Sequence, residues 1–297
     1  MAMDNLINGR RIAATIHDET SARVSLLKDR GVIPRLIFIR IGEDPASRVY
    51  VGMKEKKSQE LGIDSQTLVL GEQTTQDQLL EIISQHNADP SVHGILVQAP
   101  LPRHIDETII YSAVSPSKDV DGFHPVNVGK LMLNQSGGFM PCTPAGVHEL
   151  LIRSDISMEG AEVVVLGRGN IVGKPMAAIL IQKAKTANAT VTVCHSRTRN
   201  IAEHCRRADI IVAAIGMPQF LKADMVKKGV VIMDVGVNRI PDSTTKSGTR
   251  LVGDVDFDAI QPIAKAITPN PGGVGPMTIA MLLKNTVQAA EQPVMNG

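Results

Sequence analysis

Aromatic side chains are scarce in this chain. Of its 297 residues, 2% are aromatic, and tryptophan is absent. Proteins that bind single-stranded nucleic acids stack the bases on aromatic side chains, so this composition offers few such platforms. An excess of charge is lacking as well, because 31 basic residues face 30 acidic residues and the net charge is +1. No general attraction to nucleic acid or to an anionic membrane is therefore expected.

Cysteines and long apolar runs are also few. The three cysteines, Cys142, Cys194 and Cys205, contain no CxxC pair, which fits a reducing compartment better than a disulfide framework. No apolar run approaches the ~20 residues that span a bilayer. The N-terminus carries Asp4 and lacks the apolar core of a signal peptide. We expect a cytoplasmic protein with no membrane segment.

Short apolar runs alternate with helical patterns along most of the chain, and the length suggests two domains of ~150 residues. In the first half, strands are predicted at 35–41, 67–70 and 94–98, with helices at 46–61, from Thr74 or Thr75, and at 104–113. In the second half, strands are predicted at 162–166, 190–194, 209–215 and 230–235, with helices at 173–185, 199–207 and 222–228. This alternation predicts the α/β class, with parallel sheets covered by helices.

A segment rich in proline and glycine, residues 115–144, interrupts the alternation. It indicates a domain boundary or a functional loop. Thr143-Pro144 is typical of a helix start, and this helix is predicted to end near Arg153. We predict a first domain of residues 1–140, a Rossmann-type domain of residues 141–276, and a last helix at 277–290 that returns with residues 277–297 to the first domain.

A glycine loop follows the strand at 162–166. Its sequence, GRGNIVG (167–173), is one residue longer than the commonest dinucleotide fingerprint, and a helix is predicted directly after it. Such a loop brings backbone N–H groups and a helix N-terminus to a pyrophosphate. The alternative interpretation is a plain glycine turn between strand and helix, and the repeated strand–helix units argue against it.

The charge around the second strand of this domain favours NADP over NAD. NAD sites place an acid near the end of that strand, but no acid occurs between Glu162 and Glu203. Arg168, Ser196 and Arg197 offer groups that bind a 2′-phosphate. A solvated basic turn remains the alternative for Arg197.

Three features of the first domain are candidates for chemistry. Tyr50 and Lys54 are four residues apart and share a helix face, although such pairs are usually surface packing. Gln98 ends a predicted parallel strand, where ligands of α/β sheets bind. The segment KDVDGFHPVNVG (118–129) carries Asp119 and Asp121. A carboxylate there matches the N–H edge of a pterin, and turn capping by either acid is the alternative. No metal site is expected, because His124 has no second ligand at a useful spacing.

Together these segments resemble the bifunctional methylenetetrahydrofolate dehydrogenase/methenyltetrahydrofolate cyclohydrolase family over nearly the full length. The segments that carry the resemblance are YVGMK (50–54), GILVQAPLP (94–102), KDVDGFHPVNVG (118–129), PCTP (141–144), GRGNIVGKP (167–175), HSRT (195–198), DVGVN (234–238), GDVDF (253–257) and TPNPGGVGPMT (268–278).

The resemblance implies two reactions in one site, oxidation of methylenetetrahydrofolate by NADP and hydrolysis of the methenyl product to 10-formyltetrahydrofolate. It implies that Lys54 is catalytic, that Gln98 hydrogen-bonds it, that Tyr50 stacks on the folate and that Asp121 holds the pterin. The other folate-binding positions that it implies are Val97, Pro271, Gly272, Gly273 and Thr278. The cofactor positions that it implies are Gly167, Arg168, Gly169, Ser196 and Val237, and the charge argument adds Arg197. It also implies a homodimer formed through the cofactor domain.

Three positions depart from the family pattern. Gly169 stands where a serine is usual, Ala99 where leucine is usual, and Asn270 where valine is usual. The first affects the binding of a 2′-phosphate, and the other two lie beside the expected folate pocket. Two alternatives stay open, a monofunctional dehydrogenase and a non-catalytic protein that binds NADP or folate. Retention of Lys54 and Gln98 argues against the first, and the presence of every catalytic position argues against the second.

Overall fold

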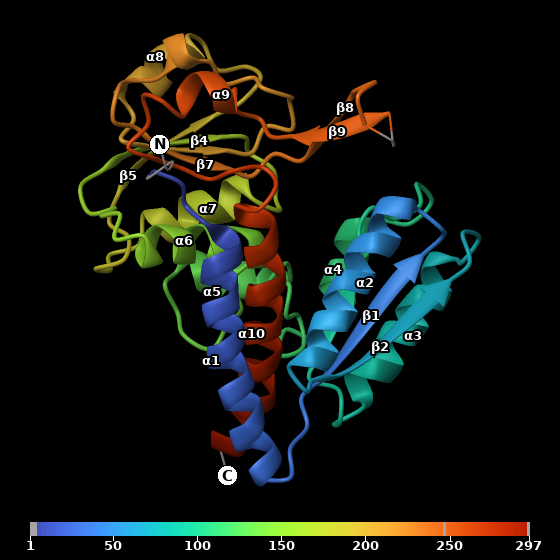
Figure 1. The fold of residues 1–297 in the computed structure, drawn as a ribbon. Coiled ribbons are helices and arrows are strands. Elements are labelled where there is room, and N and C mark those ends of the chain that lie inside the picture. The colour runs from blue at the N-terminus through green and yellow to red at the C-terminus, as the bar shows by residue number, and fades with distance from the viewer. Residues whose placement is uncertain (1–4, 246–247, 296–297) are drawn as a thin grey trace. The chain divides into compact units, whose positions relative to one another are not determined.

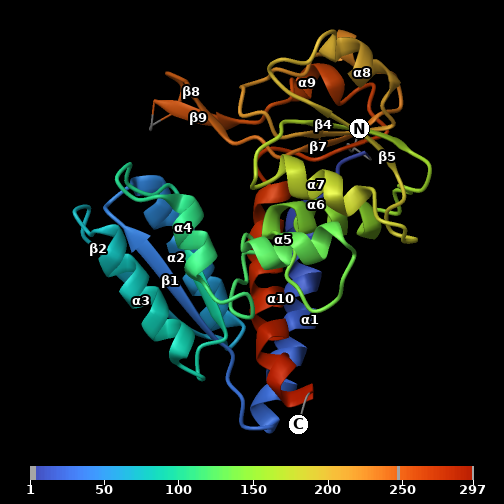
Figure 2. The ribbon, with the colours of Figure 1, turned by 180° about the vertical axis from the view of Figure 1, so that it is seen from behind.

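The computed structural model describes residues 5–245 and 248–295, and the chain divides into two compact units (Figures 1 and 2). Unit 1 comprises residues 5–13 and Thr143–Thr278, and unit 2 comprises Ala14–Cys142 and residues 279–295. The predicted domain ends at residues 1–4 and 296–297 lie outside the described residues. The chain passes between the units inside or at the start of three helices, α1 (Gly9–Asp29), α6 (Cys142–Arg153) and α10 (Val274–Met295).

Unit 2 contains a three-stranded parallel sheet in the order β2-β1-β3. Its strands are β1 (Arg35–Ile41), β2 (Asp64–Leu70) and β3 (Gly94–Val97), and its helices include α2 (Pro45–Glu60), α3 (Gln76–Ala88) and α4 (Glu107–Ala113). Alternate residues of β1, Ile37, Ile39 and Ile41, pack in one apolar cluster with Leu79 of α3 and Ile110 of α4. The other face of a strand carries the intervening residues, and α2 contacts β1 and β2.

Two elements of unit 2 were not predicted. Helix α1 has buried Ile12, Ile16, Val24 and Leu27 at helical spacing, and it lies beside α10 in both views (Figures 1 and 2). Helix α5 (Pro125–Met132) lies inside the segment predicted as a loop.

Unit 1 contains a five-stranded parallel sheet in the order β10-β7-β6-β4-β5. The strands are β4 (Glu162–Leu166), β5 (Thr190–Cys194), β6 (Ile210–Ala213), β7 (Val231–Asp234) and β10 (Ala266–Ile267). The chain order reverses at β4, since β5 lies on one side of it and β6 on the other. Ligands of open α/β sheets bind beyond the carboxyl ends of the strands at such a point. The predicted α/β class is confirmed.

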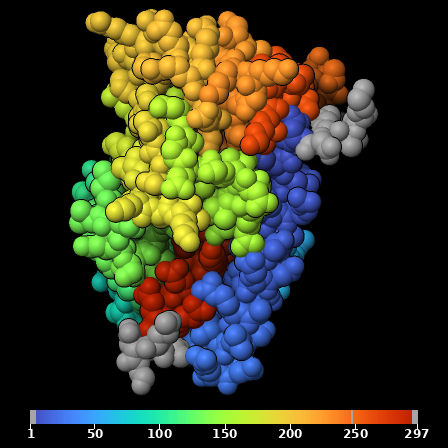
Figure 3. All heavy atoms as spheres, turned by 90° about the vertical axis from the view of Figure 1, so that its left-hand side faces the viewer, coloured from blue at the N-terminus to red at the C-terminus, as the bar shows by residue number. Residues whose placement is uncertain are grey.

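The remaining elements of unit 1 differ in part from prediction. The helices of this part are α8 (Ile201–Arg207) and α9 (Phe257–Ile260). A helix was predicted at 222–228, but the structure has only a 3₁₀ turn there, η1 (Ala223–Met225). Helix α7 (Gly173–Leu180) ends five residues early, and Figure 3 shows the following segment, in yellow, at the surface. A hairpin of β8 (Asn238–Pro241) and β9 (Thr249–Val252) was not predicted, and it projects from its unit (Figure 1).

The N-terminal segment pairs with the last strand of unit 1. Ile7 N–H donates to the Ile267 carbonyl (2.9 Å), and Ile267 N–H donates to the Asn5 carbonyl (2.9 Å). The Asn5 amide donates to the carbonyls of Gln261 and Ala264, both at 2.9 Å. The predicted boundaries grouped these residues with 1–140, because local periodicity carries no information on a partner 256 residues away.

None of the helices in residues 5–245 and 248–295 combines the length and the apolarity needed to cross a membrane.

The Asn5 side-chain oxygen also accepts from the Gln261 amide at 3.0 Å, so Asn5→Ala removes three hydrogen bonds. At ~1 kcal/mol each, we expect the substitution to lower the free energy of unfolding by about 2–3 kcal/mol. Urea denaturation measures the change. Lys228→Ala, at an exposed position of the same unit, is the control and should stay within ~0.5 kcal/mol of the wild type. An equal effect of both substitutions would contradict the anchoring role of Asn5.

Candidate active site

Lys54 is a buried lysine on α2. The buried face of this helix consists of Ser47, Val51, Lys54 and Ser58, spaced by three and four residues, so the period of the helix places Lys54 inward. Its side chain is 4% exposed. Burial lowers the pKa of Lys54, while nearby Asp121 acts in the opposite direction. A lysine in this environment releases its proton more readily than one in water.

Two of the predicted partners contact Lys54. The Nζ atom donates to Gln98 Oε1 at 3.0 Å, and it lies 4.5 Å from the centroid of the Tyr50 ring. Gln98 follows β3 directly, and its own amide donates to the Ala99 carbonyl at 2.7 Å. That second bond fixes the orientation of the amide, so the oxygen faces the lysine. Val97, the last residue of β3, is buried.

Asp121 belongs to the same cluster. Burial raises the pKa of its carboxyl, although the charge of Lys54 lowers it. The Cys142 thiol donates to the Val120 carbonyl at 3.3 Å, and this side chain is close enough to Asp121 to lower the pKa of its carboxyl. Burial raises the pKa of Cys142 well above that of a free thiol, so it stays a neutral donor. Cys142 was not predicted as part of the site.

Asp119 performs the turn capping that the sequence left open between the two acids. Its carboxylate accepts from the N–H groups of Gly122 (3.1 Å), Phe123 (3.1 Å) and His124 (2.7 Å), and from the Asn127 amide (2.8 Å). Asp119 is 5% exposed. Its carboxylate therefore shapes the turn after Asp121, and Asp121 itself is left beside Lys54. His124 Nδ1 accepts from Val126 N–H and caps α5.

Lys118 anchors the other end of this segment. Its Nζ donates to three carbonyls, of His86, Asn87 and Asp89, at 3.0, 2.9 and 2.6 Å. A cation is favourable at these carbonyls, because they belong to the last turn and the C-cap of α3. The segment also lies against β3, since Ile95 N–H donates to the Lys118 carbonyl.

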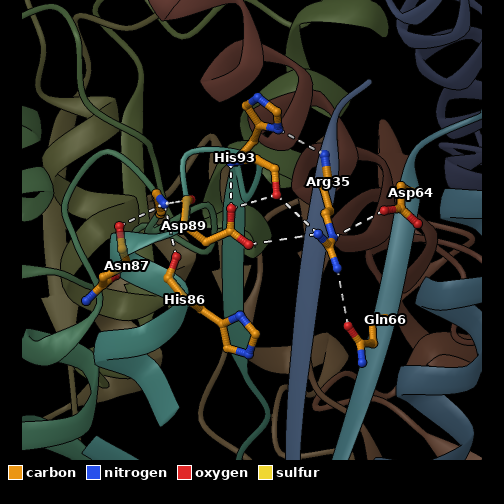
Figure 4. Close-up of polar contacts among 9 residues, drawn as sticks. Arg35, Asp64, Gln66, His86, Asn87, Asp89 and His93 are labelled. Atoms are coloured by element: carbon orange, nitrogen blue, oxygen red, sulfur yellow. Dashed lines mark hydrogen bonds and ion pairs between the residues drawn. The ribbon is translucent and has the colours of Figure 1, made fainter. Parts of the chain in front are cut away.

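A polar network closes the opposite edge of the sheet (Figure 4). Arg35, at the start of β1, pairs with Asp64 at the start of β2 (3.2 Å) and with Asp89 (3.9 Å). The Arg35 N–H donates to His93 Nδ1 at 3.1 Å. These contacts join the amino ends of the strands, whereas Gln98 follows the carboxyl end of β3. The network is therefore structural.

In unit 1, the predicted cofactor residues follow adjacent strands. Leu166 and Cys194 are partners in the β4–β5 ladder, and Leu166 also pairs with Ala213 of β6. Consequently Gly167, Arg168 and Gly169 after β4 leave the same sheet edge as Ser196 and Arg197 after β5. Val237 follows β7 at that edge and is 70% exposed.

The glycines of the 167–173 loop have different environments. Gly167 has φ +116°, and a Cβ there would lie 2.1 Å from the Ala214 carbonyl oxygen; a Cβ on Gly173 would lie 2.2 Å from the Gly167 oxygen. Both positions require glycine. A Cβ on Gly169 would meet nothing within 4 Å. The usual serine would fit at this position, so the departure removes a hydroxyl without a steric reason.

The turn after β5 presents basic groups. His195 N–H donates to Thr198 Oγ1 (2.9 Å), and Arg197 N–H donates to His195 Nδ1 (3.1 Å), which fixes the turn. Ser196 and Arg197 are exposed there, as is Arg168 after β4. This edge of unit 1 therefore carries guanidinium and hydroxyl groups suited to a phosphate.

The remaining predicted folate positions, Pro271, Gly272, Gly273 and Thr278, belong to unit 1. Gly273 packs on the first turn of α1, where a Cβ on Gly9 would lie 1.8 Å from its carbonyl oxygen, and Arg10 N–H donates to the Gly272 carbonyl. Thr278 Oγ1 hydrogen-bonds Thr143 Oγ1 at 3.0 Å. A Cβ on Gly273 would itself lie 2.6 Å from the Pro269 carbonyl oxygen, and Gly272 has φ +106°, so the backbone requires glycine at both positions.

The structure also gives Asn270 a partner, since its amide donates to the Gly236 carbonyl. No group of three or more His, Cys, Asp and Glu side chains within the described part of the chain could hold a metal ion.

Comparison with known families decides the assignment. Residues 7–121 match the catalytic domain of tetrahydrofolate dehydrogenase/cyclohydrolase, and residues 141–294 match the NAD(P)-binding domain of the same family. The chain belongs to the tetrahydrofolate dehydrogenase/cyclohydrolase family. It is thus an enzyme of the bifunctional type, and the resemblance found in the sequence is confirmed.

Individual relatives are similar over nearly the whole chain. The bifunctional protein FolD of Prosthecochloris aestuarii is 54% identical over 96% of this chain and 97% of its own. The crystal structure of FolD from Campylobacter jejuni is 47% identical with a TM-score of 0.92, covering 97% of this chain and 99% of that one. The Trypanosoma brucei enzyme, solved with NADP cofactor and inhibitor, is 40% identical with a TM-score of 0.91, covering 97% and 98%.

Asp119 should make the stability of the wild type depend on pH. Burial raises the pKa of Asp119 to about 6, against the hydrogen bonds that lower it. A carboxyl with a raised pKa in the folded state favours folding when protonated. Its contribution is therefore lost as the pH rises from about 4 to about 6.

The difference in unfolding free energy between the wild type and Asp119→Asn should fall over this range and be flat above pH 7, as measured by urea denaturation. The control is Asp44→Asn. The pKa of Asp44 is lowered by hydrogen bonds from Ser47, so its effect lies below pH 4. A difference that rises between pH 4 and pH 6 for Asp119→Asn would contradict the assigned burial.

Proposed function

We propose that this enzyme oxidises 5,10-methylenetetrahydrofolate with NADP and then hydrolyses the methenyl product to 10-formyltetrahydrofolate. The observation that carries the proposal is the buried Lys54, held by Gln98 Oε1 at 3.0 Å beside Tyr50 and Asp121. Hydrolysis needs a group that takes a proton from water as it attacks a cationic carbon. A lysine with a lowered pKa meets that need in its neutral form.

Each side chain of the cluster has a distinct role in this proposal. The Lys54 amine accepts the proton of the attacking water, and Gln98 orients the amine through its oxygen. The Tyr50 ring stacks on the folate, and the Asp121 carboxyl binds the N–H edge of the pterin. Val97, Pro271, Gly272, Gly273 and Thr278 complete the folate-binding set. Protonated Lys54 would be repelled by a cationic substrate, which lowers its proton affinity further.

The cofactor residues lie at the carboxyl edge of the sheet in unit 1. NADP, when bound, accepts the hydride from the folate methylene carbon. Its pyrophosphate fits the glycine loop before α7, and its 2′-phosphate fits Arg168, Ser196 and Arg197, while Gly167, Gly169 and Val237 give close backbone approach. The acid-free stretch between Glu162 and Glu203 supports NADP, as does the Trypanosoma brucei relative, solved with NADP.

The setting of the enzyme is also a proposal. Three free cysteines, all buried, support a cytoplasmic location. We place a homodimer contact on the cofactor-binding unit, as the resemblance implies. Two observations support this placement. Strand β5 is an edge strand of the sheet, and its apolar residue Val193 is 36% exposed, so this edge is accessible to a second copy. Neither nucleic acid nor a membrane is a partner in this proposal.

Lys54→Met tests the hydrolytic step. The substitution keeps the length of the side chain and removes the amine, so cyclohydrolase activity should fall by at least ~10²-fold, and the methenyl compound should accumulate. Absorbance of the methenyl compound, followed after mixing methylenetetrahydrofolate with NADP, measures both steps. Lys56→Met, at an exposed position of the same helix, is the matched control. Unchanged hydrolysis in Lys54→Met would refute the role of this residue.

The enzyme should prefer NADP to NAD, but only modestly. A hydrogen bond to a charged group contributes roughly 1.5–3 kcal/mol, so the hydroxyl missing at Gly169 weakens NADP binding by roughly ten- to a hundredfold. Gly169→Ser should widen the preference, because the position has open space, and Arg168→Ala should narrow it. The ratio of kcat/KM for NADP and NAD in the three proteins measures this. A wild type that prefers NAD, with a ratio unchanged in Arg168→Ala, would overturn the charge argument.

A further inference from the structure

Two buried aspartates of unit 1 lie in the segments DVGVN (234–238) and GDVDF (253–257), to which the proposed function assigns only Val237. Asp234 ends β7 and is 4% exposed, and Asp254 is fully buried. Taking carboxyl groups out of water is costly unless their oxygens accept hydrogen bonds. An apolar side chain would avoid this cost, so the bonds that the two carboxyls make indicate what they do.

Asp254 joins two loops at the carboxyl edge of the sheet. Its Oδ2 accepts from the N–H groups of Ile215 (2.7 Å) and Gly216 (2.8 Å), which follow β6. Its Oδ1 accepts from the Asn238 amide at 2.8 Å, just beyond Val237. One carboxylate thus ties the chain after β6 to the chain after β7.

Asp234 fixes the position of Asp254. Its Oδ1 accepts from the backbone N–H of Asp254 at 2.9 Å and from that of Gly236 at 3.1 Å. Burial raises the pKa of Asp234 to about 7, against the bond from the Asp254 N–H, which lowers it. Asp234, at the end of β7, therefore holds the backbone of Asp254, and the Asp254 carboxyl in turn holds the loop after β6.

Glycines make room for both carboxyls. A Cβ on Gly253 would lie 1.6 Å from Asp234 Oδ2, and a Cβ on Gly236 would lie 2.2 Å from Asp254 Oδ1. The loop after β6 also touches the glycine loop, because a Cβ on Gly167 would meet the Ala214 carbonyl oxygen at 2.1 Å. Contacts therefore run from Asp254 through residues 214–216 to Gly167.

We propose that Asp254 is a positioning residue for the nicotinamide nucleotide: its carboxylate holds the loops after β6 and β7 in the conformation that binds the cofactor. The proposal rests on the assignment of NADP to this sheet edge. Asp254 touches backbone N–H groups and Asn238 rather than the cofactor. Removing its carboxylate should therefore weaken cofactor binding through the loops and leave the folate-binding cluster of unit 2 intact.

The test compares Asp254→Ala and Asp254→Asn with the wild type. Direct calorimetric titration with NADP gives the Kd, and hydrolysis of preformed methenyltetrahydrofolate, which consumes only water, gives the cyclohydrolase rate. We expect Asp254→Ala to raise the Kd for NADP by roughly ten- to a hundredfold, as for the loss of a charged acceptor, with cyclohydrolase within about twofold of the wild type. Asp254→Asn should lose less of the affinity for NADP. Its amide oxygen still accepts from the Ile215 and Gly216 N–H groups, and the Asn238 amide can turn so that its oxygen accepts from the new amide.

The control is Asp256→Asn, two residues further along, whose carboxylate pairs with Lys222 at 2.9 Å near the surface. Its Kd for NADP should equal that of the wild type. If Asp254→Ala does not fold, Asn238→Ala decides, since it removes one bond to Asp254 and should raise the Kd several-fold with cyclohydrolase unchanged.

Two outcomes overturn the inference. One is an unchanged Kd in Asp254→Ala, or in Asn238→Ala where that variant decides. The other is an equal loss of NADP binding and cyclohydrolase, which indicates a general structural role. Failure of the wild type itself to bind NADP would instead refute the proposed function.

Discussion

A buried carboxylate that accepts backbone N–H groups is the interaction on which both sites depend. In unit 2, Asp119 gathers the N–H groups of three successive residues and the Asn127 amide. In unit 1, Asp254 gathers two N–H groups after β6 and an amide after β7. A charged acceptor makes stronger hydrogen bonds than a neutral one, and its oxygens can serve several donors at once. Loops that lack regular structure thereby gain a fixed shape.

Aspartate also contributes to the cluster around Lys54. The role of each aspartate therefore depends on its place in the fold. Asp119 and Asp121 are two residues apart, yet one is consumed by backbone donors and the other lies beside Lys54 and Cys142. The opposing shifts in pKa of Lys54 and Asp121 follow from this arrangement, since burial disfavours the charged form of each while each favours the charge of the other.

Much of the site was accessible from sequence because it depends on local periods. The spacing of Tyr50 and Lys54 follows the helical repeat, and Gln98 follows an apolar strand. The fold class followed from the alternation of strands and helices. Helix α1 was not predicted, although its apolar residues Ile12, Ile16, Val24 and Leu27 follow an equally clear helical period.

Other features depend on partners far along the chain. The choice between Asp119 and Asp121 as the capping residue required the backbone donors of residues 122–124. The role of Asp254 required Ile215 and Gly216, and the place of Asn5 required Gln261 and Ala264. No local pattern encodes such pairings, because they arise only when the sheet has assembled.

The interleaving of the two units has a consequence for synthesis on the ribosome. Residues 5–7 leave the ribosome long before the strand that they pair with, β10, which lies at residues 266–267. Unit 2 likewise needs residues 279–295 of α10, whose Glu291 pairs with Arg23 of α1 at 2.6 Å. Domains usually fold in order as they leave the ribosome. Here neither unit can be completed until residues 266–267 and 279–295 have been made, so residues 5–7 stay unpaired while about 260 residues are synthesised after them.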